Sequence, residues 1–359
     1  MENLKLIVFD NIKDLGDKVN FHLKGLNGTD EDYIIPVRND RFSNGEGKVV
    51  LGDSVRGKDI YVLSDVGNYG VTYKMRNMEV PMSPDEHFQD IKRVISATGG
   101  HASSINVVMP LLYQSRQHRR KEMESLDCAL ALQELENLNV SGVTTFDAHD
   151  PNVANSIFNM SFENFYPVSA VLSSLVKNEG DNLNDLYVVA PDMGARERAK
   201  CYADMLGTTV GVFYKKRDTS KVVDGKNPIV NHIYLGDDVS GKDVIVVDDM
   251  IASGQSMIEV SKELKERGAR RVFLVATFAL MTSGKEVFDE AYNMGYFDRL
   301  YSTNLSYVPS DITSCKWYEE VDCSYFLAKI IKALSERESL ELCSSECEEN
   351  LSKVRKMSR

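Results

Sequence analysis

The stretch Val244-Ile-Val-Val-Asp-Asp-Met-Ile-Ala-Ser-Gly-Gln-Ser256 decides the fold. Its apolar start is typical of a buried parallel strand, and two adjacent carboxylates, Asp248 and Asp249, follow before a turn rich in Ser and Gly. Similar apolar runs recur at the spacing of strand–helix units, at 143–147, 186–190 and 272–277. This alternation predicts an α/β fold with parallel sheets.

The turn after the two aspartates opens a helix and suits a bound anion. A helix is predicted from about 256 to 267, because Met257, Val260 and Leu264 form one apolar stripe. The backbone N–H groups at its start, together with the helix dipole, favour phosphate, and the two carboxylates would accept hydrogen bonds from vicinal sugar hydroxyls or lie near a metal-bound ligand. The predicted phosphosugar site comprises Asp248, Asp249, Ser253, Gly254, Gln255 and Ser256. A helix cap without a ligand is the alternative, although a cap needs only one acceptor.

Composition limits the class of protein. The 359 residues suggest about two domains, and 43% hydrophobic with 27% charged residues is an ordinary globular balance. A net charge of −12 disfavours nucleic acid as a partner, so an anionic substrate requires a local basic patch. The six cysteines are scattered and indicate neither a disulfide framework nor a zinc site. Because no apolar run has the length of a signal or membrane segment, we expect a cytoplasmic protein without a membrane partner.

The chain contains an internal echo, that is, two segments of similar sequence in its two halves. Segments 53–66 and 237–250 align without gaps and match at seven of fourteen positions, each with a Gly-Lys-Asp turn before an apolar run. Residues 67–86 are extra in the first copy. We therefore predict two similar α/β halves, 1–165 and 166–334, with a charged tail at 335–359. Chance similarity between two strand entries is the alternative.

The segment 244–256 resembles the ribose-phosphate loop of the phosphoribosyltransferase fold, an apolar strand with two acids and a Ser/Thr-Gly turn. Two branches share this loop: the phosphoribosyltransferases, and the ribose-phosphate pyrophosphokinase family, whose members make phosphoribosyl pyrophosphate from ATP and ribose 5-phosphate with two tandem copies of the fold. The internal echo favours the second branch. The resemblance implies two tandem phosphoribosyltransferase-like domains, each a mainly parallel sheet flanked by helices. Ala252 and Gln255 depart from the pyrophosphokinase pattern and fit the transferase loop better.

Two further segments resemble the ATP-binding parts of that family. The stretch from Arg41 to Gly47, followed by 53–57, resembles "FSDGE…ESVRG", which implies that Phe42 stacks on adenine while Asn44 and Glu46 make polar contacts. An exposed Asn-Gly turn is the alternative. The basic run 116–121 resembles "ARQDRK", which implies ATP contacts for Arg116 and Gln117; a solvated basic loop is the alternative, and 122–128 departs from the family pattern.

Two loops at strand ends resemble the family's metal site. Asp147-Ala-His-Asp150 resembles "DLHA", and Pro191-Asp-Met-Gly-Ala-Arg-Glu-Arg198 resembles "PDxGGxxR". The resemblance implies that His149 and Asp192 hold Mg²⁺, with Mn²⁺ as the other candidate. Histidine is an unusual ligand for a hard cation, so the residues alone indicate Zn²⁺ or Mn²⁺ as readily as Mg²⁺. Ala195 replaces one glycine of the family pattern.

The stretch Lys215-Lys-Arg217 follows the predicted strand 210–214 and begins a polar stretch through 228. It resembles the family's catalytic loop, which implies that Lys215 and Arg217 neutralise charge in the transition state.

These segments leave three hypotheses. The first is a ribose-phosphate diphosphokinase, favoured because Lys215, Arg217 and the metal pair are intact. The second is a catalytically inactive regulatory paralogue, and the third is a phosphoribosyltransferase that consumes phosphoribosyl pyrophosphate. Because the adenine segment serves a neighbouring subunit in the family, the resemblance also implies a homo-oligomer built on dimers, with a hexamer as the larger assembly.

Overall fold

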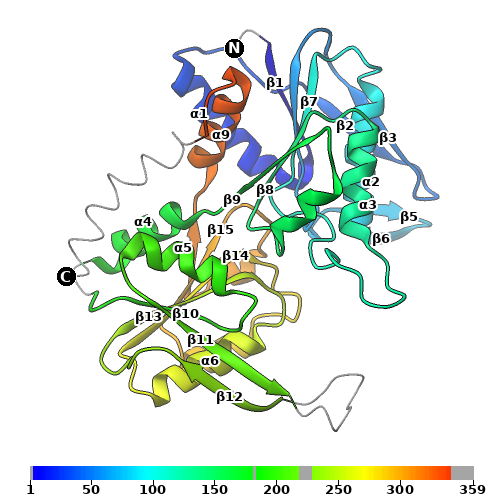
Figure 1. The fold of residues 1–359 in the computed structure, drawn as a ribbon. Coiled ribbons are helices and arrows are strands. Elements are labelled where there is room, and N and C mark those ends of the chain that lie inside the picture. The colour runs from blue at the N-terminus through cyan, green and yellow to red at the C-terminus, as the bar shows by residue number, and fades with distance from the viewer. Residues whose placement is uncertain (1–2, 181–182, 218–228, 341–359) are drawn as a thin grey trace. The chain divides into compact units, whose positions relative to one another are not determined.

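The computed structural model describes residues 3–180, 183–217 and 229–340, and these divide into two compact units (Figure 1). Unit 1 comprises 3–165, 304–309 and 322–340, and unit 2 comprises the remaining described residues. Within these residues no helix is long and apolar enough to cross a membrane.

Unit 1 is built on a five-stranded parallel sheet in the order β1-β4-β7-β8-β9. The strands are β1 (Leu4–Val8), β4 (Asp59–Leu63), β7 (Ser104–Val108), β8 (Gly142–Phe146) and β9 (Ser161–Phe165). Helices α2 (Pro84–Ala97) and α3 (Asp127–Asn137) bury their apolar stripes in the core of this sheet. Helix α1 (Lys13–Asn27) packs against α9 (Ser324–Glu336), and short 3₁₀ helices span Asp10–Ile12 and Pro151–Ser156.

Two antiparallel hairpins extend from unit 1. Strands β2 (Val37–Arg41) and β3 (Gly47–Leu51) form the first. Strands β5 (Thr72–Met75) and β6 (Met78–Pro81) form the second, with left-handed residues Arg76 and Asn77 at its turn. The extra residues 67–86 of the first half therefore contain this second hairpin and the start of α2.

Unit 2 contains a seven-stranded sheet in the order β12-β11-β10-β13-β14-β15-β16, parallel except for β12 at its edge. The strands are β10 (Tyr187–Ala190), β11 (Val210–Arg217), β12 (Ile229–Leu235), β13 (Asp243–Ile251), β14 (Arg271–Ala279), β15 (Arg299–Thr303) and β16 (Tyr318–Val321). The helices are α4 (Val168–Glu179), α5 (Arg196–Leu206), α6 (Gln255–Glu266), α7 (Glu286–Asn293) and α8 (Ser310–Thr313). Strand β13 and helix α6 confirm the strand and helix predicted around the stretch 244–256.

The two sheets repeat one topology. The order β10-β13-β14-β15-β16 in unit 2 matches β1-β4-β7-β8-β9 in unit 1. The echoing segments 53–66 and 237–250 lead into β4 and β13, which are the second strands of this shared order. This agreement confirms the predicted α/β class with two similar halves.

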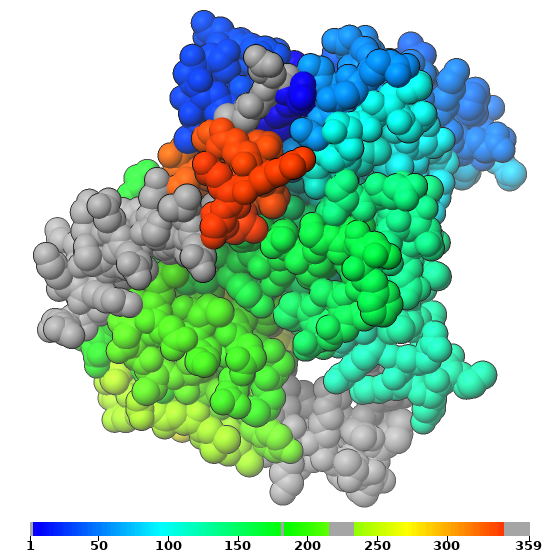
Figure 2. Space-filling view, turned by 45° about the horizontal axis from the view of Figure 1, so that its top comes forward, coloured from blue at the N-terminus to red at the C-terminus, as the bar shows by residue number. Residues whose placement is uncertain are grey.

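The chain passes from unit 1 to unit 2 at residues 165 and 166 and later returns to unit 1. Segments 304–309 and 322–340, the second of which contains α9, group with unit 1, whereas the sequence predicts that residues up to 334 belong to the second half. The reason is that α9 buries Leu327 and Ile331 and packs along α1. Figure 2 shows the orange and red residues of this segment against the blue residues near the N-terminus. The predicted charged tail begins within the last turn of α9, and its residues 341–359 lie outside the described residues.

Candidate functional site

The carboxyl end of β13 holds two carboxylates beside a buried arginine. Asp249 is buried, Asp248 is partly exposed, and Arg198 from α5 lies with its two terminal nitrogens each 3.6 Å from one of the carboxylates. Burial raises the pKa of Asp248 well above its usual value, and repulsion from Asp249 adds to the rise while Arg198 opposes it. Arg198 was absent from the predicted site, although it is the last residue of the quoted segment 191–198.

The turn that follows leaves the start of α6 without a side-chain cap. Gly254 occupies the N-cap position with φ +76, and a Cβ there would lie 2.1 Å from the ring of Phe288. A glycine is therefore required at this close approach. Ser253 and Ser256 are exposed beside it, whereas the Gln255 amide donates to Glu259 at 2.8 Å. The N–H groups in the first turn of a helix such as α6 are donors that suit an anion.

The matching position in unit 1 is closed. Helix α2 begins with a capping box, in which Ser83 accepts from the Glu86 N–H and the Glu86 carboxylate accepts from the Ser83 N–H. Asp65, which aligns with Asp249, is buried and accepts hydrogen bonds from the Ser306 hydroxyl and the Tyr307 N–H. In unit 1 the side chains of Ser83 and Glu86 therefore cap the helix start, whereas α6 of unit 2 has no side-chain cap at its N-cap position.

Two neighbouring strands of unit 2 bring the other predicted residues to the same edge of the sheet. Asp192 follows β10, which pairs with β13, and its carboxylate accepts from the N–H groups of Gly194 and Ala195 at 2.8 and 3.2 Å. Its negative charge contributes to the raised pKa of Asp248. Lys215 and Arg217 lie in β11, beside β10, and their side chains fall outside the described residues. The strand continues through Arg217, so the predicted loop start after Tyr214 was wrong.

In unit 1 the loops after β7 and β8 meet. The His149 N–H donates to the hydroxyl of Ser115 at 2.9 Å, which places His149 next to the segment that carries Arg116 and Gln117. The rings of His118 and His149 lie 5.3 Å apart between centroids. The structure therefore brings together the predicted ATP loop and the predicted metal histidine.

The predicted adenine residues lie on the turn between β2 and β3. Phe42, Asn44 and Glu46 are all exposed, and Phe42 exposes 52% of its surface. The Phe42 N–H donates to the Glu46 carbonyl at 2.8 Å, and the Asn44 carboxamide oxygen accepts from the Glu46 N–H at 3.2 Å. The turn is ordered internally while its three side chains stay accessible.

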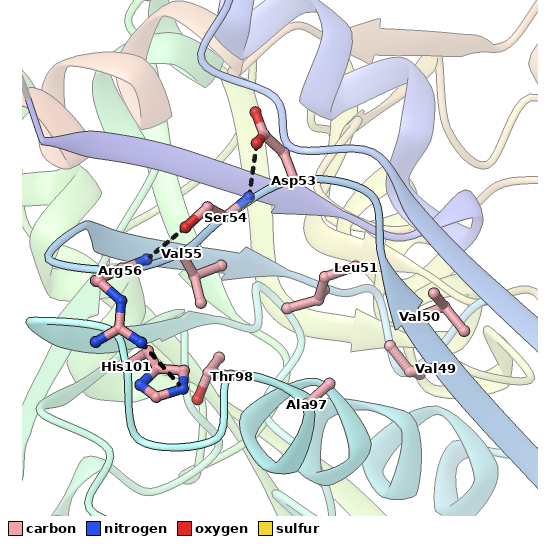
Figure 3. A pocket seen from close by; sticks show the side chains of 10 residues that line it. All are labelled: Val49, Val50, Leu51, Asp53, Ser54, Val55, Arg56, Ala97, Thr98 and His101. Atoms are coloured by element: carbon pink, nitrogen blue, oxygen red, sulfur yellow. Dashed lines mark hydrogen bonds between the residues drawn. The ribbon is translucent and has the colours of Figure 1, made fainter.

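A pocket of about 390 Å³ lies beside β3, lined by residues 49–51, 53–56, Ala97, Thr98 and His101 (Figure 3). Arg56 and His101 lie next to one another in its lining, with Nη2 of Arg56 3.5 Å from Nε2 of His101 (Figure 3). Its lining includes Asp53 to Arg56 of the segment that resembles "ESVRG" but not the 42–46 turn.

The proposed metal pair is divided between the units. His149 belongs to unit 1 and Asp192 to unit 2, so their pairing stays a prediction. Within the described part of the chain, no group of three or more His, Cys, Asp or Glu side chains is arranged to hold a metal ion.

The chain resembles known proteins along most of its length. A model of the N-terminal domain of ribose phosphate pyrophosphokinase matches residues 4–138, and a model of the phosphoribosyl transferase domain matches residues 164–298. A ribose-phosphate pyrophosphokinase of Vibrio cholerae is 26% identical over 305 residues, covering 84% of this chain and 88% of its own. Ribose-phosphate pyrophosphokinase 2 of Schizosaccharomyces pombe is 26% identical over 309 residues, covering 85% and 88%.

A solved structure shares the fold. The phosphoribosylpyrophosphate synthetase from Mycobacterium smegmatis matches with a TM-score of 0.75 at 21% identity, covering 93% of this chain and 99% of its own. Its likeness confirms the fold. The two matching models cover β1, β4 and β7 of the first sheet and β10 to β14 of the second. The chain therefore belongs to the ribose-phosphate pyrophosphokinase family, as a distant member.

Proposed function

We propose that the protein is a ribose-phosphate diphosphokinase, which transfers the β,γ-pyrophosphoryl group of ATP to the anomeric hydroxyl of ribose 5-phosphate. The observation that carries this proposal is the uncapped start of α6 beside Asp248, Asp249 and Arg198 in unit 2, set against the self-capped counterpart in unit 1. The 5-phosphate would bind at the first turn of α6 and the ribose hydroxyls at the two aspartates.

ATP would be bound by residues of the 42–46 turn and of the loop after β7. Phe42 would stack on adenine, and the Glu46 carboxylate would accept from the 6-amino group. Because the Asn44 carboxamide oxygen is engaged within the turn, Asn44 would contribute its NH₂ group as a donor. Arg116 and Gln117 would contact the phosphates.

The reaction needs positioning and neutralisation of charge. The anomeric oxygen attacks the β-phosphorus and its proton passes to solvent water. The bond between the β-phosphorus and the oxygen that bridges it to the α-phosphorus breaks, and AMP leaves with that oxygen and the electron pair. Lys215 and Arg217 would neutralise the charge that builds on the phosphoryl oxygens.

Mg²⁺, or Mn²⁺ in its place, would be held by Asp192 and His149 and would shield the phosphate charges. Asp192 fits because only one of its carboxylate oxygens accepts from the loop N–H groups described above, and carboxylate oxygen is the donor that such cations prefer. Metal removal by a chelator is expected to abolish AMP formation.

The exposed adenine turn also supports a homo-oligomer in which it serves a neighbouring copy of the chain. Light scattering of the purified protein tests this: a dimer or a multiple of it is expected, and a monomer at all concentrations would contradict it.

The first experiment measures AMP formation from ATP and ribose 5-phosphate with Mg²⁺ by chromatography. Ribose-dependent AMP that disappears in Lys215→Ala is expected. ATP binding without AMP formation would overturn the proposed activity and would favour a regulatory paralogue. Phosphoribosyl pyrophosphate consumption with a free base would instead favour a transferase.

A further inference from the structure

The β5–β6 hairpin contacts the 42–46 turn. The N–H of Arg76, at the hairpin's own turn, donates to the Ser43 carbonyl at 3.1 Å. Met75 packs against Gly45, such that a Cβ built on Gly45 would lie 3.0 Å from the Met75 sulfur. Gly45 has φ +95, so the turn is left-handed at the point that the hairpin covers.

The base of the hairpin is fixed to the same strand and helix that fix the turn. The Tyr73 hydroxyl donates to the Glu86 carboxylate at 2.5 Å, and Glu86 caps α2. The Arg41 guanidinium lies 5.7 Å from the centroid of the Tyr73 ring and forms a buried ion pair with Asp90 of α2. Strand β2, helix α2 and the hairpin therefore hold one another around the turn.

The two methionines of the hairpin differ in their surroundings. Met75 faces the 42–46 turn, whereas Met78 exposes 58% of its surface. A surface loop that must bind a base loses conformational freedom on binding, and a buttress that orders it beforehand removes part of that cost.

We propose that the hairpin 72–81 is a positioning element for the nucleotide base, which holds the 42–46 turn in its base-binding conformation. This inference rests on the proposed function, because it takes the turn as the adenine site. The hairpin lies within residues 67–86, which are extra relative to the second half of the chain. It is therefore a feature of unit 1 that the topology shared by the two units does not include.

The test compares Met75→Ala with Met78→Ala in the full-length protein. Met75→Ala is expected to raise the KM for ATP by about 3- to 10-fold, because the 42–46 turn would lose one ordering contact and become more mobile before ATP binds. The kcat and the KM for ribose 5-phosphate are expected to stay unchanged. Met78→Ala is expected to leave all three unchanged. Equal effects of the two variants, or a fall of kcat together with a rise of both KM values, would overturn the proposal.

A second measurement does not depend on activity. In a variant with Asn-Gly in place of 73–80, the two-residue turn would join Thr72 directly to Pro81, which face one another in the hairpin. Without nucleotide, the amides of 42–46 are expected to exchange hydrogen faster in this variant and in Met75→Ala, but not in Met78→Ala. Unchanged exchange in Met75→Ala would refute the buttress even if the enzyme is active. Faster exchange in these two variants, together with a wild type that forms no AMP, would support the buttress and refute the proposed activity.

Discussion

At the residue scale, the candidate site at the end of β13 depends on charged side chains that are buried or partly buried. Asp248 and Asp249 repel one another at the end of β13, and the buried Arg198 offsets part of that repulsion. Sugar hydroxyls that donate to the pair would stabilise its charged form further. In unit 1 the equivalent Asp65 has no such arginine among its described partners and instead accepts from N–H and O–H groups.

Asp65 makes stability depend on pH. Burial raises the pKa of Asp65 from 3.8 to about 6, against the hydrogen bonds that it accepts. Between these values the folded protein holds a proton that the unfolded chain has lost, so the free energy of unfolding should fall as pH rises through this window, by about 3 kcal/mol for this group. Urea unfolding at several pH values should show a shallower fall in Asp65→Asn than in the wild type. Parallel curves for the two proteins would contradict the assignment.

Glu46 should set the choice of base. Its carboxylate can accept from the 6-amino group of adenine but repels the 6-oxo group of guanine, whereas an amide can also donate. Glu46→Gln is expected to reduce the ATP-to-GTP ratio of kcat/KM by about tenfold, because a neutral acceptor replaces a charged one for adenine and a donor becomes available to guanine. Glu266→Gln, at the exposed end of α6, is the control. An unaltered ratio would remove Glu46 from the base site.

At the scale of elements, the two helix starts explain why one half of the chain keeps the phosphate site. Helix α2 closes its first turn with Ser83 and Glu86, whereas α6 begins at a glycine that carries no side chain. The same strand–turn–helix unit therefore serves stability in unit 1 and is available for binding in unit 2.

Gly254→Ala should damage the phosphate loop by two separable effects. The left-handed backbone costs an alanine about 1 to 2 kcal/mol, and the collision of its Cβ with Phe288 adds about 1 to 3 kcal/mol. Gly241→Ala isolates the first effect, because Gly241 has φ +75 and no atom within 4 Å of a Cβ built on it. Thermal unfolding should rank wild type, Gly241→Ala and Gly254→Ala in falling order, and calorimetry should show loss of ribose 5-phosphate binding only in the last. Equal destabilisation of the two variants would exclude the collision.

At the scale of the whole molecule, the chain's return to unit 1 links residues far apart in sequence. The 304–309 segment supplies Ser306 and Tyr307 to Asp65, and α9 covers α1. The stability of the N-terminal unit thus depends on residues near the end of the described chain.

Ile331→Ala should therefore destabilise unit 1. Ile331 is fully buried in α9, and its truncation should cost about 2 to 5 kcal/mol. Far-UV circular dichroism in urea follows the loss, while the fluorescence of Trp317, the single tryptophan of the chain, reports on unit 2. Tyr325→Ala, at a half-exposed position of the same helix, is the control. A transition unmoved in Ile331→Ala would contradict the assignment of α9 to the core of unit 1.

The sequence by itself determined the features that depend on neighbouring residues. The apolar run of β13, the stripe of α6 and the glycine turn between them follow from local periodicity and backbone conformation, and their repetition in the echo predicted two similar sheets. Tertiary structure decided what each element packs against. The apolar spacing of α9 is typical of a helix, but its packing partner α1 lies some 300 residues earlier in the sequence. The residues around α9 therefore carry no signal of which element it packs against. Likewise Arg198 and the β5–β6 hairpin acquire their roles only through contacts across space, because charge pairing and packing depend on distance in the fold and not along the chain.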